Sequence, residues 1–460
     1  MPFSPKLIRI ARRLILSLAL FATLIALAIV IENWRGDHAW KAMKERYAAK
    51  GDPLDVLPPP PPAVHDEQNF FCIPALAKAL THQENRFGIL GLWHYSTSAG
   101  HSLDLTEVAM HVAAEKKLPM PTKEGAYRIL HEAFAPIEPL LVALEKAAIE
   151  QPYSQIVRPE PLTVYNLFSD RNPNYDAVVS LSKKLEIHAC LMRAEGKFDI
   201  AHSDIMAELK LAYGYIEGAN TILETLIGGA ALSQAVQPIW EGCQNHEWTE
   251  TQLAEFQLQI ERCRPMMSMQ RVLICERNAG FNLNPNALAD AFPEKRSTWW
   301  AKLPGWIQQN KVSSTIGSDK FVEVVASHTT PRFSANLAQI KNDPKYSQWY
   351  PYSQLAHLIF QNIGKIIHNM IPDINGFTLA ATACALERHW LAHGSYPETL
   401  AELVPTYIDK VPLDIVNGDP LRYRRTDNGK FLLYSVGLDG KDDGGDLKKD
   451  WAWPQAVGSR

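Results

Sequence analysis

The sequence predicts a mainly α-helical protein with an N-terminal transmembrane helix, an irregular helical bundle or short helical solenoid, and a small α+β module with a β-hairpin at the C-terminus. Three observations support this prediction: an uncharged apolar run near the N-terminus, apolar residues at three- and four-residue spacing across the middle of the chain, and two strand-like segments after residue 420. The predicted divisions are a signal anchor (1–34), a juxtamembrane helix with a proline-rich linker (35–68), a helical domain (69–373) and a C-terminal module (374–460).

Residues 14–31 carry no charge, and they predict a membrane-spanning helix. At about 1.5 Å per residue this run extends roughly 27 Å, close to the roughly 30 Å hydrocarbon core of a bilayer. Because no Ala-x-Ala cleavage pattern follows, we expect an uncleaved anchor, with Trp34 and Trp40 at the membrane interface. Four basic residues precede the run and favour a cytoplasmic N-terminus, with the bulk of the chain on the periplasmic side of the inner membrane: Lys6, Arg9, Arg12 and Arg13.

Composition excludes some classes of function. The chain has 460 residues and a net charge of −4, so it lacks the basic surface typical of nucleic-acid binding. The expected partners are the lipid bilayer, through the N-terminal helix, and an envelope protein. Six cysteines are scattered without a Cys-x-x-Cys pair, which argues against a zinc ribbon or a dithiol redox motif. Buried free thiols and extracytoplasmic disulfides both remain open interpretations.

Two segments connect the predicted anchor to the helical domain. Residues 40–50 predict a short charged helix that ends at Gly51. Residues 58–62 are all proline, and a polyproline II run of about 3 Å per residue gives a semi-rigid spacer of roughly 15 Å. A docking site for a proline-recognising domain is the alternative interpretation of this run.

Helical periodicity continues from residue 69 to residue 345. Thr122 is placed to cap a helix at its N-terminus, and Gly196 is placed to end one. Gly196, Phe198 and Ala201 reproduce the turn of tetratricopeptide-like repeats, but no second copy recurs at a constant period. The clearest helices are predicted at 103–116, 123–149 and 175–195, and a second helix continues from there to 217 to form a helical hairpin. Further helices are predicted at 250–263, 266–277, 334–341 and 353–370.

The character of the sequence changes near residue 376. A helix from Phe377 is expected to end at Gly394, and a short helix follows Pro397. Strands at 421–425 and 431–436 are joined by Asp-Asn-Gly-Lys, which has the turn chemistry of a hairpin. An acidic, glycine-rich loop comes next and contains Asp439, Asp442, Asp443, Asp446 and Asp450.

The order of these motifs resembles the C-terminal part of the major pseudopilin of type II secretion. The resemblance covers roughly the last 85 residues, and the whole chain also looks similar to membrane-anchored proteins of planctomycete and verrucomicrobial bacteria, which implies a cell-envelope setting. The N-terminus lacks the pseudopilin start, so assembly into a pseudopilus does not carry over. The matching residues are Gly394, Tyr396, Pro397, Pro412, Leu413, Asp414, Tyr423, Tyr434, Ser435, Gly437, Asp439 and Gly440.

The resemblance implies a calcium site, because the acidic loop of the major pseudopilins binds this ion. Asp439, Asp446 and Asp450 would then supply side-chain oxygens, alongside loop carbonyls. Calcium takes about six to eight oxygen ligands, which a glycine-rich acidic loop is able to provide. The alternative is an acidic turn exposed to solvent.

No catalytic residues are predicted. His389 and His393 are four residues apart on one helix, but without a Glu-x-x-His context they indicate helix capping and packing rather than a metal site. Phosphate-binding loops, a Gly-x-Ser-x-Gly motif and a His-Glu-x-x-His motif are missing from the sequence. The sequence therefore favours a binding or scaffolding protein of the cell envelope. The alternative is an envelope hydrolase that acts on glycan or peptide from a groove in the helical domain.

Overall fold

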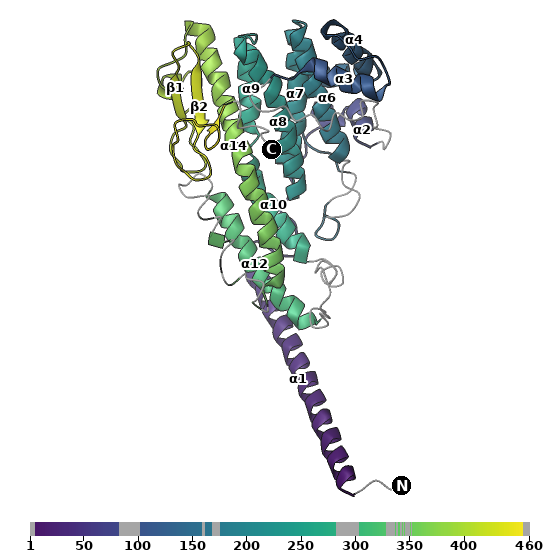
Figure 1. The fold of residues 1–460 in the computed structure, drawn as a ribbon. Helices are drawn as coiled ribbons and strands as arrows, with labels where there is room; N and C mark the ends of the chain where they lie inside the picture. The colour runs from purple at the N-terminus through teal and green to yellow at the C-terminus, as the bar shows by residue number, and fades with distance from the viewer. Residues whose placement is uncertain are drawn as a thin grey trace.

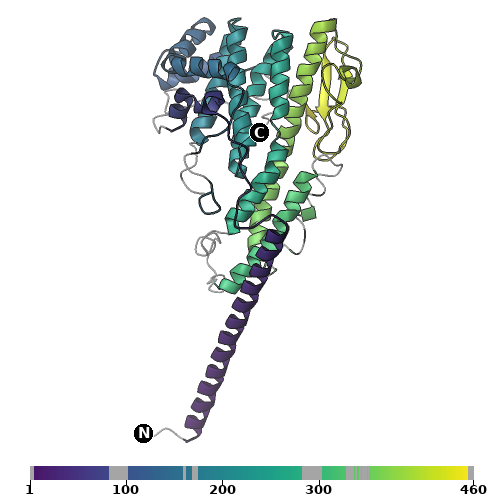
Figure 2. The same cartoon turned by 180° about the vertical axis from the view of Figure 1, so that it is seen from behind.

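The computed structural model describes residues 5–81, 102–158, 162–167, 175–281, 303–327 and 352–453, together with a few isolated positions between 336 and 350. The chain is mostly helical, and a small antiparallel sheet lies near its C-terminus, as the sequence predicted. One long helix projects from an elongated helical body, and the sheet packs on the opposite edge of that body from α3 and α4 (Figure 1). The rear view shows the same arrangement (Figure 2).

Helix α1 (Pro5–Ala49) is 45 residues long. Between Leu14 and Ile31 its large apolar side chains are exposed, apart from the partly buried Ile29, and the helix is long and apolar enough to span a membrane. The separate juxtamembrane helix predicted at 40–50 is wrong, because the same helix continues through it. Nothing between residues 32 and 49 breaks a helix, and the chain turns only at Gly51, whose φ of +78° suits glycine.

The second half of α1 packs on a narrow neck. The neck consists of α10 (Pro265–Phe281), α12 (Pro304–Ala326) and the first half of α14 (Gln354–His393) (Figure 1). Trp40 is only 8% exposed and clusters with neighbouring apolar side chains against this neck. Trp34 is 66% exposed. The expected interfacial position therefore suits Trp34, whereas Trp40 faces the body.

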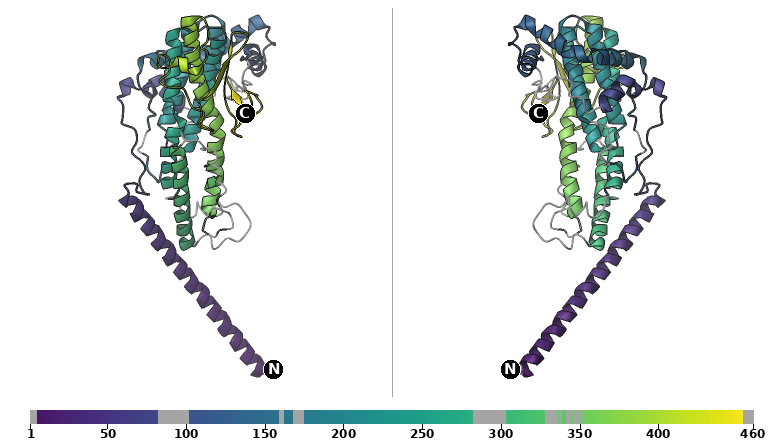
Figure 3. Two further views of the ribbon diagram at one scale, coloured as in Figure 1. Left: turned by 90° about the vertical axis from the view of Figure 1, so that its left-hand side faces the viewer. Right: turned by 90° about the vertical axis from the view of Figure 1, so that its right-hand side faces the viewer.

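The proline-rich linker returns along the body instead of extending away from it (Figure 3). The Gln155 side-chain amide donates hydrogen bonds to the carbonyls of Pro61 and Pro62, at 3.4 and 3.2 Å. Leu57 packs on a buried cluster that includes Cys275 of α10. The proline run therefore connects the neck to the first helical turns of the body while lying against its surface.

The first helices of the body are α2 (Pro74–Thr81), α3 (Leu105–Glu115), α4 (Lys123–Phe134) and α5 (Glu138–Glu150). Thr122 caps α4 as predicted, since its hydroxyl accepts a hydrogen bond from the Gly125 amide at 3.3 Å. The single helix predicted over 123–149 is divided by a 3-10 turn at Ala135–Ile137. Pro136 lacks the amide hydrogen that an uninterrupted helix requires.

The core of the body contains α6 (Tyr175–Ala194), α7 (Phe198–Glu217), α8 (Ile222–Gln244) and α9 (Glu250–Arg262). Gly196 ends α6 with a φ of +75°, as predicted. Helix α8 was not predicted. It contacts both α6 and α7, so the packing is that of an irregular bundle rather than a strict chain of neighbouring repeats.

Helix α14 was predicted as two helices, at 353–370 and from Phe377, but it is continuous across Pro372. It crosses residue 374, and the main apolar core includes residues on both sides of that position. The 3-10 turn Leu400–Leu403 and strands β1 (Arg422–Arg425) and β2 (Phe431–Ser435) follow, with Tyr423 opposite Leu433. A third strand, β3 (Trp451–Ala452), pairs with β2 and was not predicted. The helix predicted at 334–341 lies largely outside the described residues.

Candidate functional site

The acidic loop occupies the stretch between β2 and β3. It consists of one turn from Gly437 to Gly440 and another from Asp446 to Asp450, each closed by a backbone hydrogen bond. A Cβ atom at Gly437 would lie 1.7 Å from the Lys449 carbonyl oxygen, so only glycine allows the two turns to touch. This contact brings acids from both ends of the loop into one region.

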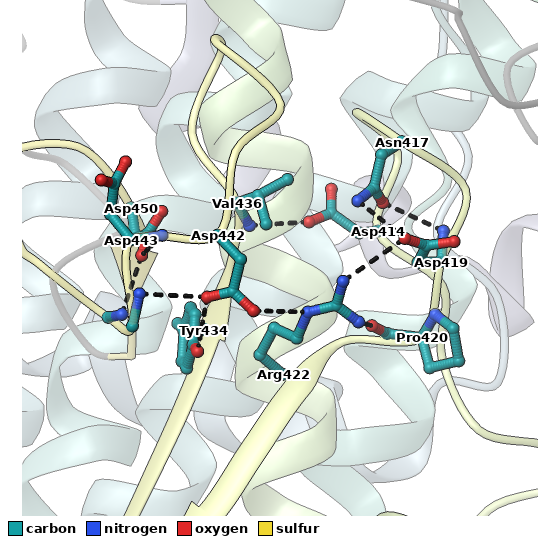
Figure 4. Close-up of polar contacts among 12 residues, drawn as sticks. Asp414, Asn417, Asp419, Pro420, Arg422, Tyr434, Val436, Asp442, Asp443 and Asp450 are labelled. Carbon is teal, nitrogen blue, oxygen red and sulfur yellow. Dashed lines mark hydrogen bonds and ion pairs between the residues drawn. The ribbon is translucent and has the colours of Figure 1, made fainter.

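Asp450 is the buried acid of the loop, with 2% of its surface exposed. Its Oδ2 accepts hydrogen bonds from the amides of Asp443 and Gly445, at 3.1 and 2.8 Å (Figure 4). Among the described residues, its Oδ1 has no hydrogen-bond partner, and the same is true of the buried Asp443 Oδ2. The loop therefore holds two carboxylate oxygens without a hydrogen-bond partner among the described residues, although Lys449 pairs with the other Asp443 oxygen at 2.7 Å.

The other two predicted calcium ligands have a different environment. Asp439 and Asp446 are exposed, and each accepts a hydrogen bond at 3.1 Å from the amide two residues further on, in Lys441 and Lys448. These bonds stabilise the turns themselves. Of the three acids proposed from the sequence, the structure buries only Asp450. Asp443, which the sequence analysis did not select, lies next to it.

Asp442 links the acidic loop to the hairpin (Figure 4). It accepts hydrogen bonds from the Gly444 amide at 3.0 Å, the Tyr434 hydroxyl at 2.8 Å and Arg422 Nε at 3.0 Å. These bonds, the Gly444 amide foremost, lower the pKa of Asp442. Burial, together with the Asp442 carboxylate, raises the pKa of Tyr434 to about 12. The network fixes the loop to the sheet.

Asp414, from the Pro-Leu-Asp motif, connects the module to α14. It is 2% exposed and accepts hydrogen bonds from the amides of Val416 and Val436, at 2.9 and 2.8 Å, and from the Asn375 side chain at 3.3 Å. Burial raises the pKa of Asp414, and these hydrogen bonds oppose the rise. Asp414 thus joins the end of β2 to the long helix, which is a structural role.

His389 and His393 lie at the end of α14. Nδ1 of His389 contacts the Ser395 carbonyl oxygen, and Nδ1 of His393 contacts the His389 carbonyl oxygen, both at 2.9 Å. The two rings stack with centroids 4.1 Å apart. These contacts agree with the capping and packing role expected from the sequence.

A second cluster of ionisable groups lies inside the helical body and was missed by the sequence analysis. His188 of α6 and Asp204 of α7 are bonded through Nδ1 and Oδ2 at 2.7 Å, and Glu145 of α5 lies beside them. One ligand atom from each residue lies within 4.8 Å of the others. The available signal was the presence of titratable residues within the apolar helical stretches at 185–192 and 204–212.

Comparison with protein families, with curated proteins and with solved structures gave no match. The resemblance to the pseudopilin module therefore depends on the motifs in the sequence alone.

Proposed function

We propose that this chain is a single-pass, membrane-anchored cell-envelope protein of the binding or scaffolding type, acting in secretion or envelope assembly. The observation that carries the proposal is the continuity of α1, which passes from an exposed apolar segment, with only Ile29 partly buried, into the packed neck without a break. A helix that is rigid at this point fixes the position of the body relative to the bilayer.

Two glycines allow α1 to pack closely on the neck. A Cβ atom at Gly36 would lie 2.3 Å from the Gly305 carbonyl oxygen, and one at Gly305 would lie 2.2 Å from the Glu32 carbonyl oxygen. The Gly305 amide also donates a hydrogen bond to Asn33 Oδ1 at 2.9 Å. Any larger side chain at either glycine would force α1 and α12 apart.

Arg277 of α10 joins the end of α1 to the neck. Its side chain is 2% exposed and binds Asp52 of the linker at 2.7 Å and Asp319 of α12 at 2.6 Å. Its guanidinium carbon lies 5.2 Å from the centroid of the Tyr47 ring of α1, and the Tyr47 hydroxyl bonds to Asp319. Three segments therefore meet at one buried arginine, which favours a rigid connection.

The basic residues before the apolar run support insertion with the N-terminus in the cytoplasm and the body in the periplasm. The test introduces cysteines that are labelled with a membrane-impermeant maleimide on spheroplasts. Asp427→Cys, at the exposed hairpin turn, should be labelled on intact spheroplasts to an extent above that of the parent protein. Lys6→Cys, on the other side of the apolar run, should be labelled only after permeabilisation. The opposite pattern would overturn the orientation, and a chain recovered in the soluble fraction would overturn the anchor.

The binding role is tested by cross-linking in membranes, followed by purification in detergent. We expect the wild-type chain to retain a specific envelope protein, and Gly305→Leu, which disrupts the neck, to retain less of it while still inserting. A matched control is Gly229→Leu, because a Cβ atom at Gly229 has no neighbour within 4 Å among the described residues. Recovery of no partner with the wild-type chain would contradict the proposal.

We further propose that the acidic loop binds calcium, with Asp450 and Asp443 as the side-chain ligands that fit it best. The supporting observation is their pair of buried carboxylate oxygens, which lack partners within the described part of the chain. Adding CaCl2 to the full chain in detergent should raise the thermal unfolding midpoint, and EGTA should reverse the rise. Asp450→Asn should abolish the effect, whereas the exposed Asp427→Asn should not. An unchanged midpoint in the wild-type chain would exclude the site.

The alternative, an envelope hydrolase acting on glycan or peptide, is favoured by one observation. Glu145 and Asp204 place two acids beside His188 in the helical body, which is an arrangement that acid–base chemistry uses. The purified chain would be assayed for cleavage of cell-wall glycan and of peptide. Activity that Glu145→Gln abolishes without loss of helicity would favour the hydrolase over the scaffold.

A further inference from the structure

We propose that Glu145, His188 and Asp204 form a binding site for one divalent transition-metal ion of the zinc class. The proposal does not depend on the scaffolding role. An imidazole nitrogen and two carboxylate oxygens are ligands that zinc accepts, whereas calcium and magnesium favour oxygen alone.

The three residues come from successive helices that pack side by side. Helix α7 contacts both α5 and α6, so these helices hold the three side chains in place. The three ligand atoms lie within 4.8 Å of one another. Zinc ligands lie about 2.0–2.2 Å from the ion, which puts tetrahedral neighbours roughly 3.3–3.6 Å apart. Small side-chain movements are therefore enough to close the site around an ion.

The environment of Asp204 suits a bound cation. Asp204 is completely buried, and within the described residues its Oδ1 has no hydrogen-bond partner. Its other oxygen, Oδ2, is bonded to His188 Nδ1. A buried carboxylate with an unused oxygen is costly, and an ion that binds this oxygen would offset the cost.

Burial disfavours the charged forms of two of the three side chains, Asp204 and Glu145. Burial raises the pKa of Asp204, and the contact with His188 opposes the rise. Burial and the charge of Asp204 together raise the pKa of Glu145 to about 7. A metal ion binds the deprotonated carboxylates, so zinc binding should weaken as the pH falls.

One of the three ligands is partly exposed, and three protein ligands leave a coordination position open. Glu145 is half-buried on α5, whereas Asp204 and His188 are buried. Three protein ligands leave one position of a tetrahedral zinc site for water, which is the pattern of exchangeable or catalytic zinc rather than of a closed structural site.

A second histidine–carboxylate pair provides a matched control. His131 of α4 contacts Glu195 Oε1 at 2.6 Å, and Lys197 binds Glu195 Oε2 at 2.8 Å. Both oxygens of this carboxylate therefore have partners, and His131 is partly exposed to solvent. This pair has the same chemistry as His188 and Asp204, but both of its carboxylate oxygens have partners.

The test uses the full chain in detergent, stripped of metal and kept in excess CaCl2 so that the acidic loop does not contribute. Zinc titration by calorimetry should show one ion per chain. Cobalt should give visible d–d bands without the intense near-ultraviolet band of thiolate ligation, which separates this site from the six free cysteines. Glu145→Gln should weaken binding at least tenfold, and Asp204→Asn should do the same, whereas His131→Gln should leave it unchanged.

Three results would overturn the proposal: no bound ion in the wild-type chain, a cobalt spectrum dominated by thiolate, or equal zinc affinity in Glu145→Gln and the wild type. Circular dichroism establishes that each variant is folded. The wild-type titration and the cobalt spectrum test the proposal even if Asp204→Asn does not fold.

Discussion

Arg193 in the helical body and Arg422 in the C-terminal module have the same bonding but different surroundings. Arg193 binds Glu241 and Glu247, and its side chain is 11% exposed, with Glu241 at 2%. Arg422 binds Asp419 and Asp442, with 34% of its own side chain exposed and 57% and 42% of theirs. Each arginine therefore joins two carboxylates. The group around Arg193 is mostly buried, whereas the group around Arg422 is in contact with solvent.

This difference shows that burial, rather than the number of ion pairs, decides what a pair contributes to stability. Removing one partner of a buried pair leaves an uncompensated charge, whereas water screens the remaining partner of an exposed pair. Arg277 in the neck is intermediate, because its own side chain is 2% exposed but its partners Asp52 and Asp319 are 39% and 30% exposed. The three arginines form a graded series that mutation is able to test.

Arg193→Ala should have the largest effect, a loss of about 3–5 kcal/mol in the free energy of unfolding. Glu241 would lose its arginine partner in the core, where its other bonds come from the Leu103 amide at 2.7 Å and the Gln237 side chain at 2.8 Å. Urea unfolding in detergent, followed by circular dichroism, measures the loss. The double variant with Glu241→Gln should recover part of it. A loss below about 1 kcal/mol would contradict the importance of burial.

Arg277→Ala should cost less, about 2–3 kcal/mol, because it removes charge-assisted hydrogen bonds whose acid partners reach solvent. The loss should also free the end of α1, so limited proteolysis should cut more rapidly near residues 50–56. The matched control is Lys50→Ala, because exposed Lys50 lies 5.7 Å from the centroid of the same Tyr47 ring without joining the buried network. Equal cleavage of the two variants would show that Arg277 does not hold the junction.

The features that the sequence predicted are local ones. The Thr122 cap, the glycine ends at Gly196 and Gly394 and the hairpin turn each depend on a few adjacent residues. The continuity of α1 and α14 was missed because long-range packing decides it. Pro372 would ordinarily end a helix, but α14 is packed against α9 and α12 on either side of that position.

The candidate sites were harder to predict, because their residues meet only in three dimensions. Asp52 and Arg277 are 225 positions apart, and Glu145 reaches His188 and Asp204 from a different helix. The five aspartates of the acidic loop have similar neighbours in the sequence. The close approach of Gly437 to Lys449 and the bonds from the Asp443 and Gly445 amides accompany the burial of Asp450, whereas Asp439 and Asp446 are exposed.

Glu276, a carboxyl group of α10, makes the stability of the fold depend on pH. Burial raises its pKa to about 7, with the Ile222 amide opposing the rise and Glu224 adding to it. A carboxyl group whose pKa is raised on folding stabilises the folded state below its unfolded pKa, near 4.5, and this contribution is lost as pH rises through 7. Glu276→Gln keeps an acceptor for the Ile222 amide and should reduce the stability lost between pH 4.5 and 8 by about 1–2 kcal/mol. Parallel pH profiles for the wild type and the variant would contradict this assignment.

Arg422→Ala should have the smallest effect, below about 1 kcal/mol, because its partners are exposed and water replaces the guanidinium. Asp442 would keep its bonds from Tyr434 and the Gly444 amide, so the acidic loop should stay attached to the hairpin. Raising the salt concentration should remove most of the small difference from the wild type. The same salt series should leave the loss in Arg193→Ala nearly unchanged, because that charge is out of contact with solvent. If Arg422→Ala cost as much as Arg193→Ala, the carboxylates of the two regions would have to be equally desolvated, contrary to their exposures of 42% for Asp442 and 2% for Glu241.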